Sequence, residues 1–161
     1  MSGPIAIIAG AGQFPFHVAQ EAKRHGARVV ALGLQGWVDQ GLRGLVDAYE
    51  EMELGQLQRI LQWLKAQGVR QAIMAGKVTK EVLFDAGAHL DAQMQQLLSR
   101  VTDPSVTNLL GAVADRLAQE GIELLDSSTF LREALCPAGV LTTRTPTPSE
   151  TRDIQLGQHY F

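Results

Sequence analysis

The sequence predicts an α/β protein with a Rossmann-like three-layer fold, built on a mainly parallel sheet of about five strands. Short runs of β-branched and other apolar residues alternate with longer segments whose apolar residues recur every three or four positions. The first such run is followed at once by a glycine-rich turn and a helix start. Strands that alternate with helices favour a parallel sheet with right-handed crossovers and with helices on both faces.

The first strand is expected at residues 5–9, five apolar residues that suit burial on both faces of a sheet. A helix over residues 15–25 follows, because a proline suits its first turn and a glycine comes directly after its end. Residues 28–33 (RVVALG) predict the second strand. A glycine-punctuated stretch with one short helix around Trp37 comes next, and then a weaker strand at residues 49–54.

The middle of the chain carries the clearest helix signal. Residues 56–67 (QLQRILQWLKAQ) place four aliphatic side chains on one helical face and stop before a glycine. Residues 71–75 (QAIMA) predict another buried strand. Two further helices are expected near 88–99 and 104–119, and a last strand at 122–125.

The chain is predicted to divide into a Rossmann-like α/β domain over residues 1–147 and the start of a linker or second domain over residues 148–161. The residues TPSE at 147–150 make a good helix start, since a proline and an acidic residue suit a first helical turn. Because the sequence stops soon afterwards, we expect the rest of that second domain to be missing. Residues from about 148 onward are then expected to be disordered or to pack against another copy of the chain.

Composition narrows the classes of function. The formal charge of −3 and the pI of about 5.8 leave no basic surface for a nucleic-acid backbone, so we expect no nucleic-acid partner. Cys136 is the only cysteine, which excludes a disulfide framework within one chain and fits a reducing cytoplasm. No apolar run approaches the roughly 20 residues that span a bilayer, and the N-terminus does not resemble a signal peptide. We therefore expect a cytoplasmic protein.

The stretch IAIIAGAGQFP at residues 5–15 leads from a strand into a helix, the context in which backbone N–H groups and a helix dipole bind phosphate. The candidate ligand-binding residues in it are Gly10, Ala11, Gly12 and Gln13. A dinucleotide loop would carry a third glycine where Pro15 stands, and an acidic residue after the second strand, where this chain reads GLQG. NAD is therefore disfavoured. The alternative that the glycines only make a tight turn stays open.

A second candidate loop begins at Gly76, which follows the predicted strand at 71–75, and continues with Lys77. Small residues at the carboxyl end of a buried strand let a ligand approach the backbone. The pair is not a Walker motif, because the first glycine of that motif would fall on Gln71 and the residue after the lysine is Val78. Lys77 is a candidate partner for a phosphate group, and an ordinary solvated lysine is the alternative.

The remaining polar residues give one more candidate. Arg144 and Thr145 lie among hydroxyl residues in GVLTTRTP, a composition that suits phosphate recognition and that a proline-bounded linker explains equally well. The histidines are scattered, and the carboxylates do not fall at a spacing typical of a metal site or an acid–base pair. The sequence therefore predicts neither a metal ligand nor a catalytic residue.

Three segments of the chain follow one another in a distinctive order. They are IIAGAGQFP at residues 7–15, ELGQLQRILQWLKAQGVRQAIMAGKV at residues 53–78 and GVLTTRTPTPSETRDIQLG at residues 139–157. Together they resemble the amino-terminal domain of the LpxI family, the UDP-2,3-diacylglucosamine pyrophosphatases of lipid A (lipopolysaccharide) biosynthesis in Gram-negative bacteria. The resemblance covers nearly the whole chain. It implies a hydrolase that converts UDP-2,3-diacylglucosamine to UMP and 2,3-diacylglucosamine 1-phosphate.

The resemblance also implies a site. Its ligand-binding residues are Gly10, Gly12 and Gln13 in the first loop, Gly76 and Lys77 in the second, and Arg144 and Thr145 at the entry to an interdomain linker. The catalytic aspartate is expected on a carboxy-terminal domain beyond this chain, so the catalytic residues are unknown here and the chain alone is expected to be inactive. Mg²⁺ is the expected cofactor of the full-length protein.

The implied partners are UDP-2,3-diacylglucosamine, its lipid product and, through that substrate, the surface of the inner membrane, where the protein would be peripheral. The oligomeric state is open, a homo-oligomer included. The alternative function, from a different class, is a free-standing nucleotide-binding or sensing module without catalysis.

Overall fold

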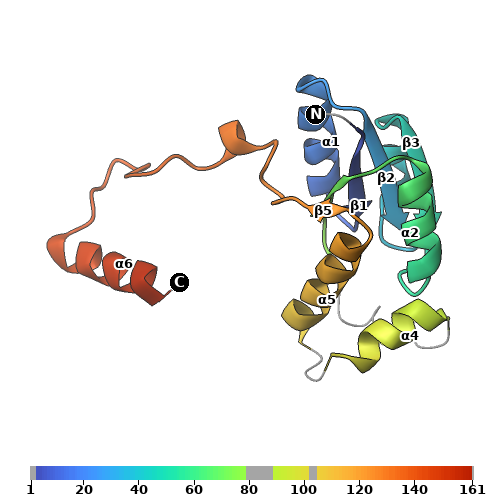
Figure 1. Cartoon of the computed structure of the whole chain (residues 1–161). Coiled ribbons are helices and arrows are strands. Elements are labelled where there is room, and N and C mark those ends of the chain that lie inside the picture. The colour runs from blue at the N-terminus through green and yellow to red at the C-terminus, as the bar shows by residue number, and fades with distance from the viewer. Residues whose placement is uncertain (1–2, 79–88, 102–104, 161) are drawn as a thin grey trace.

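A five-stranded sheet forms the centre of the protein (Figure 1). The computed structural model describes residues 3–78, 89–101 and 105–160. The strands are β1 (Ile5–Ala9), β2 (Val29–Leu34), β3 (Ala48–Met52), β4 (Gln71–Ala75) and β5 (Glu123–Leu124). Their order is β3-β2-β1-β4-β5, and every neighbouring pair is parallel. The predicted Rossmann-like α/β fold with about five strands is therefore confirmed.

Helices cover both faces of this sheet. The α-helices are α1 (Phe14–Arg24), α2 (Leu57–Ala66), α4 (Ala92–Ser99), α5 (Val106–Gln119) and α6 (Pro148–Tyr160), and the 3₁₀ helices are η1 (Gln40–Gly44) and η3 (Arg132–Ala134). α1 and η1 pack on one face, where they form one apolar cluster with the strands. α2, α4 and α5 pack on the other face and form a second cluster. The result is the three-layer arrangement in which a central sheet is buried on both sides.

The alternation of side chains along β1 shows how the two clusters are divided. Ile5 and Ile7 point into the cluster with α1, whereas Ala6 points into the cluster with α2 and α5. All three are almost completely buried. Successive residues of a strand face opposite sides of the sheet, so a strand buried on both faces needs apolar residues at every position.

Two elements differ from the sequence prediction by more than two residues. The prediction of a short helix around Trp37 is wrong, because Trp37 lies in a turn and the short helix of this stretch is η1, which begins at Gln40. It begins after Asp39, whose carboxylate accepts the Gly41 N–H at 2.8 Å. The helix expected near 88–99 begins only at Ala92, and residues before 89 in that range lie outside the described part of the chain.

Asp91 joins the amino-terminal ends of two helices. Its Oδ1 accepts the Met94 N–H of α4 at 2.8 Å, and its Oδ2 accepts the Gln58 N–H of α2 at 2.7 Å. The first turn of any helix leaves N–H groups without an intrahelical acceptor, and a carboxylate there also complements the helix dipole. One carboxylate therefore caps both helices and fixes how α2 and α4 meet.

A second polar link holds α2 against α5. Glu120, just after α5, forms ion pairs with Lys65 of α2 and with Arg116 of α5. These two hydrogen-bonded cations lower the pKa of the Glu120 carboxyl below its ordinary value. The two helices on this face of the sheet are thus tied at their carboxyl ends.

The carboxy-terminal segment leaves the body of the protein. Phe130 and Leu131 are still buried against the α1 face, but from Arg132 to Tyr160 only Pro146 and Glu150 are even half-buried. In Figure 1 this segment, orange to red, extends away from the sheet and ends in α6. Residues Pro148–Tyr160 form α6, in which no residue is buried. The expectation that this segment is disordered or packs against another copy stays a prediction, as does the domain boundary at 147. Among the described residues, no helix is long and apolar enough to cross a membrane.

We expect the change Asp91→Ala to destabilise the fold by about 2–3 kcal/mol, because each lost helix cap costs about 0.5–2 kcal/mol. Asp39→Ala is the matched control, since Asp39 caps only one short, exposed helix. Urea unfolding at pH 7 measures both. Equal losses in the two variants would show that the bridge between α2 and α4 contributes nothing beyond a single cap.

Candidate functional site

The two predicted glycine loops meet at the carboxyl edge of the sheet. β1 and β4 are neighbours in the sheet, and the residues that follow them pair in a short antiparallel bridge between Ala11 and Lys77. The Ala11 N–H donates to the Lys77 carbonyl at 2.9 Å, and the Lys77 N–H donates to the Ala11 carbonyl at 2.8 Å. The Gly10 N–H donates to the Ala75 carbonyl at 2.8 Å. The loops are therefore joined through their backbones.

Glycine is required on both sides of this crossing. A Cβ atom on Gly10 would lie 2.7 Å from the Lys77 carbonyl oxygen, and one on Gly76 would lie 2.7 Å from the Gly10 carbonyl carbon. Gly76 also has a φ of +96°, which favours glycine. Packing of one backbone on the other thus explains Gly10 and Gly76, and the roles of these two glycines in ligand binding stay predictions.

The start of α1 still offers free donors next to this crossing. Among the described residues, no group accepts from the backbone N–H of Gly12, Gln13 or Phe14. Gln13 is exposed, and its side chain makes no hydrogen bond to a described residue. Backbone N–H groups at a helix start, together with the helix dipole, suit an anion. These donors are consistent with the predicted roles of Gly12 and Gln13, which stay predictions.

Lys77 brings a positive charge to the same edge. Its side chain is exposed and forms no ion pair with a described residue, whereas Lys23 pairs with Asp47 and Lys65 with Glu120. The bridge with Ala11 fixes its backbone beside the start of α1. A lysine in this position is available as a point charge for a phosphate group.

An apolar cavity of about 410 Å³ opens beside the two loops. Gly10, Gly76 and Lys77 lie at its edge, and its walls come from the carboxyl ends of β1 and β4 and from α2, α4 and α5. Small-molecule sites typically enclose about 300–1,000 Å³. They also favour the place where the strand order of an open α/β sheet reverses, which here lies between β1 and β4.

A larger hollow of about 820 Å³ lies between α4 and α5 and is lined mostly by polar side chains, among them Gln93, Arg100 and Asp115. None of the residues predicted from the sequence lies in it. The cavity beside the loops is therefore the better candidate, although it is smaller.

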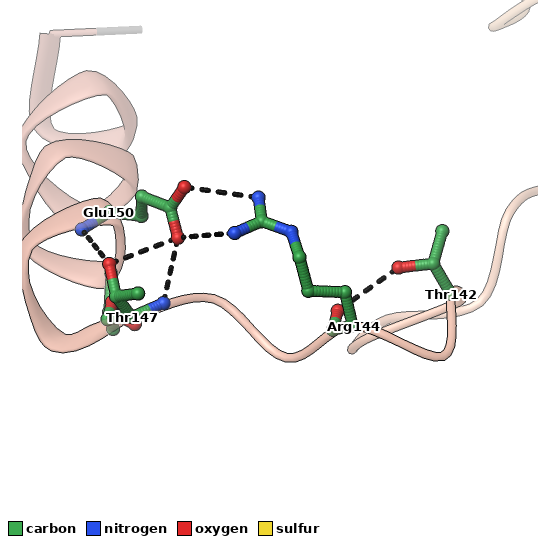
Figure 2. A network of polar contacts seen from close by, with 5 residues as sticks. Thr142, Arg144, Thr147 and Glu150 are labelled. Atoms are coloured by element: carbon green, nitrogen blue, oxygen red, sulfur yellow. Dashed lines mark hydrogen bonds and ion pairs between the residues drawn. The ribbon is translucent and has the colours of Figure 1, made fainter.

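Arg144 and Thr145 are not brought to these loops. Figure 2 shows Arg144 paired with Glu150 through two hydrogen bonds of 3.1 and 3.0 Å, with Thr142 donating to the Arg144 carbonyl at 3.1 Å. Glu150 also accepts the Thr147 N–H at 2.8 Å, which closes a cap at the start of α6. Arg144 and then Thr147 lower the pKa of the Glu150 carboxyl. The observed role of Arg144 is to stabilise this helix start, and ligand binding by Arg144 and Thr145 stays a prediction.

The described residues do not form a metal site. Within them, no three histidine, cysteine, aspartate or glutamate side chains gather closely enough to hold an ion. Two of the described aspartates have structural roles instead: Asp91 caps two helices, and Asp126 accepts the Ser128 N–H at 2.8 Å in a turn. The described residues therefore do not fit Mg²⁺ by themselves.

Solved structures are similar to this chain at low sequence identity. A UDP-glucose-4-epimerase (galE) from Stenotrophomonas maltophila, with bound NAD and formylated UDP-arabinopyranose, is 14% identical with a TM-score of 0.52, over 98% of this chain and 47% of that one. A GalE-like L-threonine dehydrogenase from Cupriavidus necator is 18% identical with a TM-score of 0.46, over 75% of this chain and 36% of that one. A biotin carboxylase domain of a thermophilic 2-oxoglutarate carboxylase, bound to ADP, is 12% identical with a TM-score of 0.45, over 74% of this chain and 22% of that one. The chain thus spans less than half the length of these structures.

The sheet order and the crossed glycine loops define a Rossmann-like α/β domain with its ligand edge between β1 and β4. No curated protein sequence gives a significant match to this chain. The model of the LpxI N-terminal domain matches residues 4–134. The chain therefore belongs to the LpxI family, and the match ends within the first residues of the segment that leaves the body of the protein.

We expect Gly10→Ala to destabilise the fold by about 1–3 kcal/mol, because the new methyl group must push the two backbones apart. The matched control is Gly111→Ala in α5, where an added Cβ meets nothing within 4 Å. That change should stabilise the fold by about 0.5–1 kcal/mol, since alanine favours a helix interior. Thermal unfolding measures both changes, and a neutral Gly10→Ala would refute the close crossing of the loops.

Proposed function

We propose that this chain is the substrate-binding domain of a UDP-2,3-diacylglucosamine pyrophosphatase in lipid A biosynthesis. The complete enzyme would hydrolyse the pyrophosphate bond to give UMP and 2,3-diacylglucosamine 1-phosphate. Membership of the LpxI family supports this assignment. The observation that carries it is the bridge between Ala11 and Lys77, which fixes the backbone of Lys77 beside the start of α1. Among the described residues, the Lys77 side chain has no ion-pair partner and the N–H groups of Gly12, Gln13 and Phe14 have no acceptor.

The proposed work of this edge is to bind and neutralise the pyrophosphate. Backbone N–H groups and an ammonium group that are already oriented stabilise phosphate charge without having to reorganise. The substrate is also a lipid, and the apolar cavity beside Lys77 matches that second property. A site with a charged edge next to an apolar cavity suits an amphiphilic substrate better than a free nucleotide.

The groups that activate water are proposed to lie outside this chain. The described residues hold no cluster that fits a metal ion, and those that line the cavity beside Lys77 include no carboxylate. The family resemblance implies a requirement for Mg²⁺. We propose that this requirement belongs to the full-length protein. Its expected location is the cytoplasmic face of the inner membrane, where the lipid substrate is found.

The test is hydrolysis of UDP-2,3-diacylglucosamine, with and without Mg²⁺, by this chain and by the full-length protein. We expect turnover only by the full-length protein with Mg²⁺, and only binding by this chain. Binding of UMP and UDP-sugars without turnover in either protein would favour the alternative, a nucleotide-binding or sensing module. Turnover by this chain near the full-length rate would contradict the proposed division of labour.

Lys77→Ala in the full-length protein should lower kcat/KM by about tenfold or more, because an interaction with phosphate charge worth about 1.4 kcal/mol is a factor of ten. Arg70→Ala is the matched control. Arg70 is an exposed cation directly before β4, whereas Lys77 follows the same strand at its other end. An equal loss in both variants would assign the effect to overall charge rather than to the site.

A further inference from the structure

The two faces of the central strands are not covered equally. On the α1 face, Ile7 and Ile73 are completely buried. On the opposite face, Ile8 of β1 and Met74 of β4 are only half-buried, although they are paired partners at the centre of the sheet. Central strands of a parallel sheet are normally buried on both faces. Part of the apolar sheet is therefore uncovered where β1 and β4 end.

The gap above Ile8 and Met74 is the apolar cavity described above. α2 contributes Leu57 and Ile60 to its wall, and α5 contributes Val113 and Leu117. Among the described residues that line it, Lys77 alone has a polar side chain. The ion pairs of Glu120 hold α2 to α5, and both helices line the cavity. The packing of these two helices therefore fixes part of the cavity wall.

The side chains that line the cavity determine which kind of ligand it can bind. A water molecule needs two to four polar partners, and these walls do not supply them. A nucleobase would leave its polar edge unpaired, which costs affinity. A flexible hydrocarbon chain needs no polar partner, and the methionines Met74 and Met94 adapt readily to such a chain. Lys77 and the free N–H groups at the start of α1 favour a negative charge outside the cavity.

We infer that this cavity binds one unbranched alkyl chain of an anionic amphiphile, with the head group at Lys77. Assigning that chain to the acylated substrate of the hydrolase rests on the proposed function. The inference that the cavity can hold an alkyl chain does not rest on the proposed function. It follows from the apolar side chains of the cavity walls and from the charge of Lys77 at the edge.

The first test uses this chain, dodecanoate as the probe, and methionines labelled with ¹³C in the methyl group. Met74 and Met94 line the cavity, whereas Met52 is buried in the same apolar cluster and does not line it. We expect saturable binding of one dodecanoate per chain, with shifts of the Met74 and Met94 methyl signals and an unchanged Met52 signal. No binding, or equal shifts of all three signals, would overturn the inference.

Variants locate the chain and the head group separately. Val113→Phe fills the cavity from α5 and should weaken dodecanoate binding at least tenfold, whereas Val140→Phe, on the exposed carboxy-terminal segment, should not.

Lys77→Gln should weaken the binding of dodecanoate severalfold and leave the binding of dodecan-1-ol unaffected, and Arg70→Gln should change neither. Wild-type affinity in Val113→Phe would overturn the inference, and if that variant does not fold, the methionine signals still decide.

Dodecyl phosphate and dodecanoate distinguish the two sources of such a chain. Tighter binding of the phosphate points to a phosphorylated lipid, and tighter binding of the carboxylate points to a free fatty acid. Binding of either supports the alkyl site, and failure of both to displace a dansylated fatty acid refutes it. None of these measurements involves hydrolysis, so the proposed function can fail while the alkyl site stands.

Discussion

The backbone bridge between Ala11 and Lys77 is the contact on which the rest of the site depends. It joins two loops that are far apart in the sequence and exists because Gly10 and Gly76 have no side chains. It holds the start of α1 against the end of β4. The backbone therefore brings together the start of α1, Lys77 and the edge of the apolar cavity. The N–H groups at the start of α1 have no acceptor among the described residues, and no side-chain contact is needed for this arrangement.

This arrangement separates two chemistries over a short distance. The loops carry donors and a charge that suit phosphate, and they also line a cavity that suits hydrocarbon. A ligand that uses both must be amphiphilic. The strand order creates this place, because the direction in which successive strands are added to the sheet reverses between β1 and β4.

Particular residues show how far the sequence could be interpreted. The strand at 71–75 was predicted with the observed bounds, since its apolar run lies between clear breaks. The prediction of a helix near Trp37 was wrong, because the helix propensity of this stretch is weak. A turn forms at Trp37, and the cap by Asp39 starts the helix later. No role was predicted for Asp91 from the sequence. An aspartate before a helix is a capping signal, but its second bond, to α2, joins distant parts of the chain.

The sequence by itself determined the alternation of strands and helices, the α/β class and the two glycine loops as the places of interest, because periodicity and turn chemistry are local. Only the tertiary structure decided that the glycines serve a backbone crossing and that Lys77 is left without an ion-pair partner among the described residues. It also decided that a cavity remains over Ile8 and Met74. These features depend on which strands become neighbours and how helices from distant segments cover them, and no local pattern encodes that.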